Sequence, residues 1–317
     1  MSGPRRYDVV TLGEVLVEVA TDSAFAHGVP ARLGVSGDAL NVAAAAARAG
    51  ARVGLAAALT DDELGRAVAA RIAELGISTD LLRFRPGQQG VYLVHSDPEG
   101  QREFSYARSG SVGSTLSPAD LDEEAIRTSG AVVAGGIACA ISETAHEAVR
   151  AAARLAGRFV FDPNHRPRLT TRERAAADLA ELTPGAFLVT PSFPGETAAL
   201  LGCDTALEAA HRLLADGARQ AAVTCGSRGV QLAAPGWEEW IDAVPAPAVV
   251  DQTGAGDAFV GTLTARLVLG DGFAGAARLA AAAASLSVGG RGGTGFLPGL
   301  EQIRAHAATA TATGGPR

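Results

Sequence analysis

Asp251-Gln252-Thr253-Gly254-Ala255-Gly256-Asp257 is the stretch around which the rest of this 317-residue chain is organised. Two glycines precede a carboxylate where an apolar helix is expected to begin, and Gly270 is expected to end that helix. Helix N-termini present unpaired amide donors, and glycine lets a phosphate approach the backbone closely. The stretch therefore predicts a phosphate-binding turn in which Asp257 accepts the proton of an attacking hydroxyl. Helix capping is the alternative role for Asp257.

The chain contains no lysine, so all 27 basic residues are arginine. A Walker phosphate loop, a protein-kinase fold and a Schiff-base aldolase each need a lysine, and all three are therefore excluded. Codon bias toward arginine and alanine explains the absence. A phosphate bound by this chain is expected to be held by backbone amides.

Composition indicates a globular protein without a nucleic-acid or membrane partner. The formal net charge is -7, and 47% of the residues are hydrophobic. No basic face is expected to attract nucleic acid or an anionic membrane. Cys139, Cys203 and Cys225 form no Cys-x-x-Cys pair and are expected to be reduced thiols without a disulfide or zinc role. Because no signal segment or membrane span is evident, we expect a cytoplasmic location.

Strand and helix patterns alternate along most of the chain. The expected strand-helix pairs are 52–60 with 61–75, 131–135 with 143–156, 158–162 with 171–182, and 187–190 with 196–201. Strands are also expected at 7–13, 220–224, 229–233 and 237–244, and a helix at 274–288. This alternation predicts an α/β domain in which helices cover both faces of a mainly parallel sheet. We expect one domain over residues 1–317, with a frayed tail at 307–317.

Two segments interrupt the alternation and predict a small sheet. Strands at 89–95 and 102–108 are joined by the turn-forming residues 96–100, and together they predict a hairpin. With a strand at 15–20 they would form a lid sheet, inserted at about residues 15–35 and 88–110. A projecting sheet has exposed edges and an open face that a second copy can cover, so a homodimer is expected.

An early glycine and an asparagine point to a sugar site. Gly37 and Asn41 flank the start of an alanine-rich helix that Gly50 is expected to end, with Asp38 as a candidate N-cap. A bare backbone beside an amide suits a sugar hydroxyl, whereas a closely packed helix without other function is the alternative. Glu14 follows the first strand and is either a ligand contact or an exposed turn residue.

Together, Asp251-x-Thr253-Gly254-Ala255-Gly256-Asp257 and the early Gly37-x-x-x-Asn41 resemble the two signatures of the ribokinase-like (PfkB) carbohydrate kinases. The resemblance extends from Tyr7 to about residue 305. It implies a doubly wound sheet with a β-sheet lid. It also implies transfer of the γ-phosphoryl group of ATP to a primary sugar hydroxyl, a reaction that depends on positioning and charge neutralisation.

The resemblance also assigns roles to residues. It implies that Asp257 is the base and that the amides of Gly254, Ala255 and Gly256 bind the transferring phosphoryl group. Thr224, Gly226 and Gly229 are implied on the nucleotide side, and residues 289–294 are implied to close over adenine or a monovalent cation. Mg²⁺ would bridge the phosphates.

Two positions depart from the family pattern. The family's Gly-Gly pair is Ser36-Gly37 in this chain. Its Asn-x-x-Glu magnesium element is Phe193-Pro194-Gly195-Glu196, which keeps the glutamate and loses the asparagine. Glu196 therefore remains the candidate for the water shell of the metal.

The acceptor is predicted from a separate set of side chains. Tyr92, Tyr106 and Arg108 lie on the expected lid hairpin, and Arg166 follows a core strand. Two guanidiniums in one pocket would bind a carboxylate bidentately, and the set resembles most the 2-keto-3-deoxygluconate kinases of the family. Fructokinases carry similar arginines and are the alternative, followed by other sugar or nucleoside kinases. A structural or phosphate-facing role for both arginines also stays open.

Two further classes are disfavoured. A non-catalytic sugar or nucleotide sensor would be expected to have lost Asp257 or its glycine turn, and both are present. A dinucleotide-binding oxidoreductase would need a glycine fingerprint directly after the first strand, and Gly13-Glu14-Val15-Leu16 contains none.

Overall fold

In the computed structural model, which describes residues 5–96 and 102–313, ten strands form one large sheet. The strand order is β14-β13-β12-β11-β10-β9-β1-β4-β5, and β6 also pairs with β4. All neighbours are parallel except the β12–β13 and β13–β14 pairs. The strands are β1 (Val9–Leu12), β4 (Val53–Thr60), β5 (Ile77–Ser78), β6 (Leu82–Arg85), β9 (Ala131–Gly135), β10 (Phe159–Asp162), β11 (Leu188–Val189), β12 (Ala221–Thr224), β13 (Gly229–Ala234) and β14 (Trp237–Asp242). Residues 225–228 form the turn between the antiparallel strands β12 and β13.

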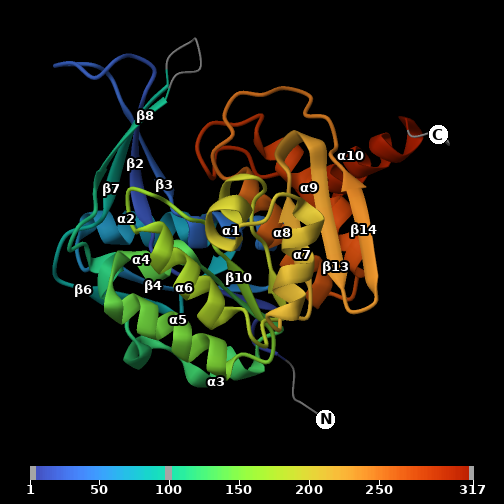
Figure 1. Ribbon diagram of the computed structural model, residues 1–317. Helices are drawn as coiled ribbons and strands as arrows, with labels where there is room; N and C mark the ends of the chain where they lie inside the picture. The colour runs from blue at the N-terminus through green and yellow to red at the C-terminus, as the bar shows by residue number, and fades with distance from the viewer. Residues whose placement is uncertain (1–4, 97–101, 314–317) are drawn as a thin grey trace.

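Helices cover both faces of this sheet, as the alternation predicted (Figure 1). Neighbouring residues of one strand enter opposite cores: Val9 belongs to one buried cluster and Val10 to the other. The first core contains α1 (Asp38–Arg48), α2 (Glu63–Glu74), α8 (Ala255–Val268) and α9 (Phe273–Ser287). The second contains α3 (Glu123–Thr128), α4 (Gly136–Ile141), α5 (Glu143–Leu155), α6 (Arg172–Leu182) and α7 (Ala206–Ala215). The doubly wound fold is confirmed.

Helices α1 and α8 lie unusually close together in the first core. A Cβ atom at Gly261 of α8 would lie 2.2 Å from the Val42 carbonyl oxygen and 2.9 Å from the Ala45 Cβ of α1. Small residues on both helices permit this approach, because a larger side chain would push the backbones apart. The two helices that carry Asn41 and Asp257 are thereby held against each other.

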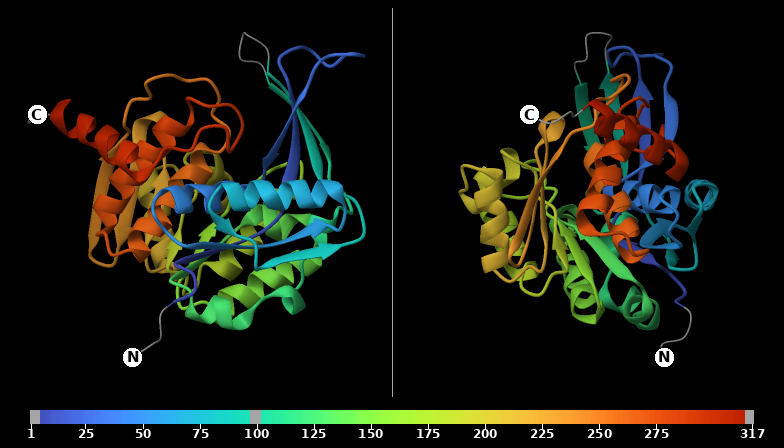
Figure 2. Two further views of the ribbon diagram at one scale, coloured as in Figure 1. Left: turned by 180° about the vertical axis from the view of Figure 1, so that it is seen from behind. Right: turned by 90° about the vertical axis from the view of Figure 1, so that its right-hand side faces the viewer.

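Four of the described strands form a second sheet, in the order β3-β2-β7-β8. They are β2 (Leu16–Thr21), β3 (Arg32–Ser36), β7 (Val91–Ser96) and β8 (Arg102–Ala107). This sheet, called the lid below, rises from one end of the main body in Figures 1 and 2. The expected hairpin is present as β7 and β8, although most of its turn lies outside the described residues. The pattern did not predict β3.

Several local predictions were wrong. Asp38 does not cap α1, because Gly37 occupies that position and no side chain bonds there. Residues 197–201 form a π-helix instead of an α-helix, and α7 was not predicted. The tail expected to fray is helical up to Thr313 in α10 (Leu300–Thr313), since Ile303 is buried against the alanines of α9. Residues 314–317 lie outside the described part of the chain. No described helix has both the length and the apolar character needed to cross a membrane.

Candidate active site

A cavity of about 630 Å³ lies between the carboxyl ends of the core strands, the lid and the start of α8. Ligands of open α/β sheets bind at this edge. Most residues predicted from the sequence line the cavity: Gly37, Asn41, Tyr92, Tyr106, Arg108, Arg166, Glu196, Thr224, Gly254, Gly256 and Asp257. Ala255, Gly226 and Gly229 were predicted too and do not line it.

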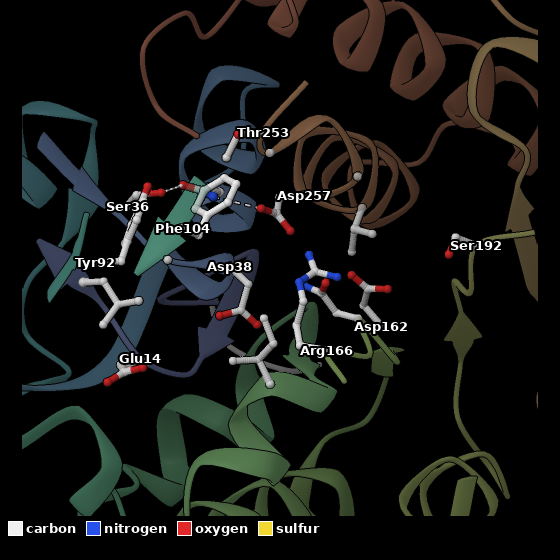
Figure 3. Close-up of a pocket in the computed structure, with 18 of the residues that line it drawn as sticks. Glu14, Ser36, Asp38, Tyr92, Phe104, Asp162, Arg166, Ser192, Thr253 and Asp257 are labelled. Atoms are coloured by element: carbon white, nitrogen blue, oxygen red, sulfur yellow. Dashed lines mark hydrogen bonds between the residues drawn. The ribbon is translucent and has the colours of Figure 1, made fainter. Parts of the chain in front are cut away.

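Asp257 lies in the first turn of α8 and faces the cavity (Figure 3). The Asn41 side-chain amide donates a hydrogen bond to its Oδ2 at 2.8 Å, and the Ser36 hydroxyl donates to Asn41 Oδ1 at 3.3 Å. Burial, followed by the nearby charge of Asp38, raises the pKa of Asp257 to about 6. Asn41 and Arg166 oppose this rise. A carboxylate with a pKa of this size suits a general base near neutral pH.

The glycine turn before Asp257 is shaped by the Gly-rich loop of residues 289–295. Gly254 has φ +79°, and a Cβ atom there would lie 2.9 Å from the Gly293 Cα. The Asp251 carboxylate accepts hydrogen bonds from the Thr253 amide at 2.7 Å and from the Gly292 amide at 2.8 Å, so it joins the turn to the loop.

The amides expected to bind phosphate are not equivalent. The Ala255 N–H donates to the Gln252 carbonyl at 3.3 Å. Among the described residues, the amides of Gly254 and Gly256 have no hydrogen-bond acceptor. Because both glycines also line the cavity, these two amides suit an anion better than that of Ala255 does.

Gly37 forms the opposite wall of the cavity. It has φ +127°, and a Cβ atom there would lie 2.5 Å from the Glu14 carbonyl oxygen. Only glycine fits this position without backbone movement. Gly37 thereby brings the start of α1 against the turn between β1 and β2.

Glu14, left open between a ligand contact and an exposed turn residue, is a buried member of the cavity wall. Its side chain is only 1% exposed, and its Oε2 lies 2.5 Å from the Nη2 of Arg108, which is itself 10% exposed. The Ser111 hydroxyl donates to Glu14 Oε1 at 2.7 Å. The charge of Arg108 is therefore neutralised by Glu14. The sequence had suggested that Arg108 would be a second unpaired cation in the pocket, and the structure does not show this.

Replacing Glu14 by glutamine is expected to destabilise the protein by about 3 kcal/mol, because the substitution leaves the Arg108 charge enclosed without its partner. Urea unfolding measures this loss. Glu63→Gln, at an exposed position of α2, is the matched control and should change stability by less than about 0.5 kcal/mol. Equal stability of the two variants would contradict the importance of the buried pair.

Arg166 is one of two cavity arginines without an ion pair among the described residues; the other, Arg168, donates a hydrogen bond to the Phe104 carbonyl at 2.9 Å. Figure 3 shows Arg166 between Asp162 and Asp257. Arg166 is exposed, and it donates a hydrogen bond to the neighbouring His165 carbonyl at 3.3 Å. It forms no ion pair within the described ranges, although its charge opposes the rise in pKa of Asp38, Asp162 and Asp257. The side chain is free to bind an anionic group of a ligand.

The aromatic residues of the lid have different roles. Tyr92 is buried, and its hydroxyl donates to Glu18 within the lid sheet. Tyr106 is exposed and lies beside Tyr92, with ring centroids 5.9 Å apart. The guanidinium of Arg108 lies 5.8 Å from the centre of the Tyr106 ring. Tyr106 and Phe104 therefore offer apolar faces to a sugar, whereas the Tyr92 hydroxyl is already bonded.

Glu196 lines the cavity and is held by the backbone of two loops. Its carboxylate accepts hydrogen bonds from the His165 amide at 2.6 Å and from the Ser192 amide and hydroxyl at 2.7 and 2.8 Å. The pKa of Asp162 is raised well above its usual range. Burial is the largest cause, and the negative charges of Glu196 and Asp257 add to it. Such a concentration of carboxylates fits a divalent cation that would neutralise it.

The residues expected on the nucleotide side separate into two groups. Thr224 lines the cavity at the end of β12 and pairs with Ser192. Gly226 and Gly229 both have positive φ angles in the following turn. A Cβ atom at Gly229 would lie 2.2 Å from the Ile241 carbonyl oxygen. Gly229 is therefore required by packing against β14, whatever it contributes to nucleotide binding.

Sequence reasoning missed two carboxylates of the cavity, Asp38 and Asp162. The first was interpreted as a helix cap, and the second as the end of a strand. Burial raises the pKa of both. The position of Asp162 at the carboxyl end of the buried strand β10, four residues before Arg166, was the signal that could have identified it.

Comparison with known proteins agrees with this geometry. The model of the pfkB family carbohydrate kinases matches residues 7–299. The chain is 34% identical over 297 residues to 2-dehydro-3-deoxygluconokinase of Thermoproteus tenax, covering 92% of this chain and 91% of the relative. It is 32% identical over 272 residues to fructokinase-1 of Oryza sativa, covering 82% and 83%.

The fold also matches a solved structure described as a putative ribokinase II from E. coli in complex with ATP and Mg²⁺. The TM-score is 0.86 at 24% identity, covering 95% of this chain and 99% of the other. Members of the matched family are sugar phosphotransferases. With the family match spanning nearly its whole length, this chain belongs to the pfkB family of carbohydrate kinases.

Proposed function

We propose that this kinase transfers the γ-phosphoryl group of ATP to a primary hydroxyl of 2-keto-3-deoxygluconate. The observation that carries the proposal is Arg166, whose guanidinium has no ion-pair partner among the described residues and faces Asp257 across the cavity. A sugar acid that places its hydroxyl at Asp257 would bring its carboxylate within reach of Arg166, and a guanidinium binds a carboxylate in a bidentate geometry. The identity to the Thermoproteus tenax relative supports this acceptor.

In this proposal the two walls of the cavity perform different tasks. Asp257 accepts the proton of the sugar hydroxyl, and Asn41 holds the carboxylate in place through its 2.8 Å hydrogen bond. The amides of Gly254 and Gly256 stabilise the charge on the transferring group. Asp38, beside Gly37, would accept hydrogen bonds from other sugar hydroxyls.

The nucleotide and its metal belong to the same proposal. Bound Mg²⁺ supplies charge neutralisation at the phosphate oxygens, and Glu196 with Asp162 is the pair that would hold its water shell. ATP would approach from the side of Thr224. A monovalent cation at residues 289–294 stays a prediction, which assays in potassium and in choline salts would test.

Fructokinase is the second candidate because Arg108 is paired with Glu14. Of the two arginines predicted to bind the carboxylate, only Arg166 lacks an ion pair among the described residues, and rice fructokinase-1 is nearly as similar as the sugar-acid kinase. A neutral ketose would need no carboxylate partner. The two acceptors therefore differ in how much they depend on Arg166.

A coupled assay of ADP release decides between them. Equal concentrations of 2-keto-3-deoxygluconate, fructose and ribose are compared by kcat/KM. We expect the sugar acid to exceed both neutral sugars by at least about tenfold, the size of one charge-assisted hydrogen bond. A large excess with fructose would identify a fructokinase, and no turnover with any acceptor would contradict the kinase assignment itself.

The dependence of kcat/KM on pH should reveal the pKa of Asp257. The base acts when deprotonated, and burial raises its pKa to about 6, so kcat/KM should rise with pH through about 6 and level off above it. Because Asn41 donates to the charged form, Asn41→Ala should move this rise to higher pH. A profile that does not change in the variant would contradict the link between the two residues.

The oligomeric state is a further proposal: two copies are expected to pair through the lid. Leu33 on β3 is 74% exposed and lies on the face of the lid opposite to Tyr106 and the cavity, so that face presents an apolar side chain to solvent. Sedimentation should give a dimer, and Leu33→Glu should give a monomer. A monomeric unmodified protein at micromolar concentration would contradict this proposal.

A further inference from the structure

A buried cluster outside the active-site cavity brings together three side chains that can bind a metal. Cys139 of α4, His146 of α5 and Asp178 of α6 each offer one ligand atom, and these atoms lie within 4.8 Å of one another. The residues are only 4%, 3% and 4% exposed. Ligand atoms of a tetrahedral zinc site lie about 2.0–2.3 Å from the ion and so about 3.3–3.8 Å from one another, which these side chains could reach by drawing together by up to about 1.5 Å.

One buried nitrogen atom of this cluster, His146 Nε2, lacks a hydrogen-bond partner in the described ranges. It lies 3.5 Å from Asp178 Oδ1 and 3.6 Å from Glu181 Oε2, too far for a good hydrogen bond to either. A buried polar atom without a partner is costly, and Nε2 could bind a metal ion once its proton has moved to Nδ1. Glu181 lies outside the group of mutually close ligand atoms and is paired with Arg150, but its Oε2 is near enough to His146 to make it the candidate for a fourth ligand.

The charges around His146 favour a cation. Its Nδ1 lies 2.7 Å from Arg174 Nη2, and because a guanidinium only donates, the imidazole is neutral with its proton on Nε2. Asp178, Glu181 and Glu143 carry three negative charges, while Arg174 and Arg150 carry two positive charges. The described cluster therefore has a net charge of minus one, which becomes minus two when the Cys139 thiol loses its proton. A divalent cation would balance it.

We propose that Cys139, His146 and Asp178 bind Zn²⁺, with Glu181 as the fourth ligand. A thiolate, an imidazole and carboxylates together suit zinc better than magnesium or calcium, which prefer oxygen ligands alone. This proposal departs from the sequence-based expectation that no cysteine has a zinc role. The spacing along the chain could not reveal the site, because its ligands come from three different helices.

Two protons must move when the zinc ion binds, one on Cys139 and one on His146. The Cys139 thiol releases its proton to solvent, and the His146 proton moves from Nε2 to Nδ1. Arg174 must then leave Nδ1, and its Nη2 already lies 3.3 Å from Glu143 Oε2. Glu143 Oε1, 3.8 Å from Nδ1, is placed to accept the new N–H. A carboxylate that orients a metal-binding histidine is a common arrangement.

A metal ion at this position would stabilise the helices on which the loop that carries Arg166 rests. Asp178 and Arg166 both line a small cavity behind the active site, together with Asn164 and Leu169. A metal that joins α4, α5 and α6 would therefore fix the helices beneath the loop that carries Arg166. Its role is structural, and it contributes no group to the reacting atoms.

The test uses the full chain, treated with a chelator and then titrated with Zn²⁺ and, separately, with Co²⁺. We expect one zinc ion per chain by calorimetry and, with Co²⁺, a near-ultraviolet charge-transfer band from the thiolate. Cys139→Ser should remove the band, whereas the matched variants Cys203→Ser and Cys225→Ser should keep it. Glu143→Gln should weaken zinc binding by about 10- to 100-fold, as for other outer-shell partners.

Two outcomes would overturn the proposal: a folded protein that gives no thiolate band, or a band that survives Cys139→Ser. Zinc bound in the active-site cavity is distinguished by the band itself, because no cysteine is among the described residues that line that cavity. Near-ultraviolet circular dichroism checks that Cys139→Ser is folded. If it is not, Asp178→Asn provides the second variant, with weaker zinc binding expected and unchanged binding contradicting the site.

Discussion

Asp257→Asn is expected to lower kcat by about 10²- to 10⁴-fold, the range for loss of a general base. The asparagine keeps the size of the side chain and can still accept the hydrogen bond from Asn41, which lies 2.8 Å from the carboxylate in the native protein. Only the proton acceptor is lost. The dissociation constant for ATP, measured by calorimetry, should therefore change little.

Asp61→Asn is the matched control, because Asp61 is exposed and lies at the start of α2, away from the cavity. It should retain the native kcat. A near-native rate in Asp257→Asn would remove Asp257 from the role of base. A parallel loss of rate and of ATP binding would instead indicate that the start of α8 had been disturbed.

Arg166→Ala is expected to lower kcat/KM for 2-keto-3-deoxygluconate by about 10²-fold, as expected when a carboxylate loses charge-assisted hydrogen bonds. The same variant should turn over fructose at close to the native kcat/KM, because a neutral sugar has no carboxylate to lose. Side-by-side kinetics with the two acceptors measures the difference. The contrast between acceptors separates recognition from a structural role, which would lower both rates equally.

Two further variants make the result specific. Arg172→Ala removes an exposed arginine six residues away, and it should leave both rates unchanged. Arg166→Lys keeps the charge but loses the planar pair of donors, so it should recover only part of the lost kcat/KM. Full recovery by lysine would show that the positive charge alone is enough to bind the carboxylate, and bidentate binding would then be rejected.

The sequence predicted the sheet well because the pattern of each core strand is local. A strand such as β4, buried along its whole length, is apolar almost throughout, and its helix follows within a few residues. β3 was missed because two of its five residues are exposed and its partner β2 defines it. The helix α10 was missed because its alanine- and threonine-rich composition reveals nothing of the contact between Ile303 and α9.

Most residues of the predicted site line one cavity, but the contacts between them were not predicted. Asp257 and Asn41 were found from separate motifs 216 positions apart, and only the fold shows that they share a hydrogen bond. Arg108 was expected to be free because its partner, Glu14, lies 94 positions earlier in the chain. Ion pairs between distant segments leave no periodic signal, which is why the charge state of the pocket could not be derived from the sequence.

The close contact between α1 and α8 at Gly261 has a consequence for how this enzyme could be altered. The proposed base, Asp257, and Asn41 stand on two helices that cannot move apart independently, and the lid reaches this pair through the hydrogen bond from Ser36 of β3 to Asn41. In the proposed function, chemistry and choice of acceptor are therefore carried largely by separate parts of the molecule. A change of substrate preference can be sought among the lid strands and the loop bearing Arg166, while the machinery that moves the phosphoryl group is left intact.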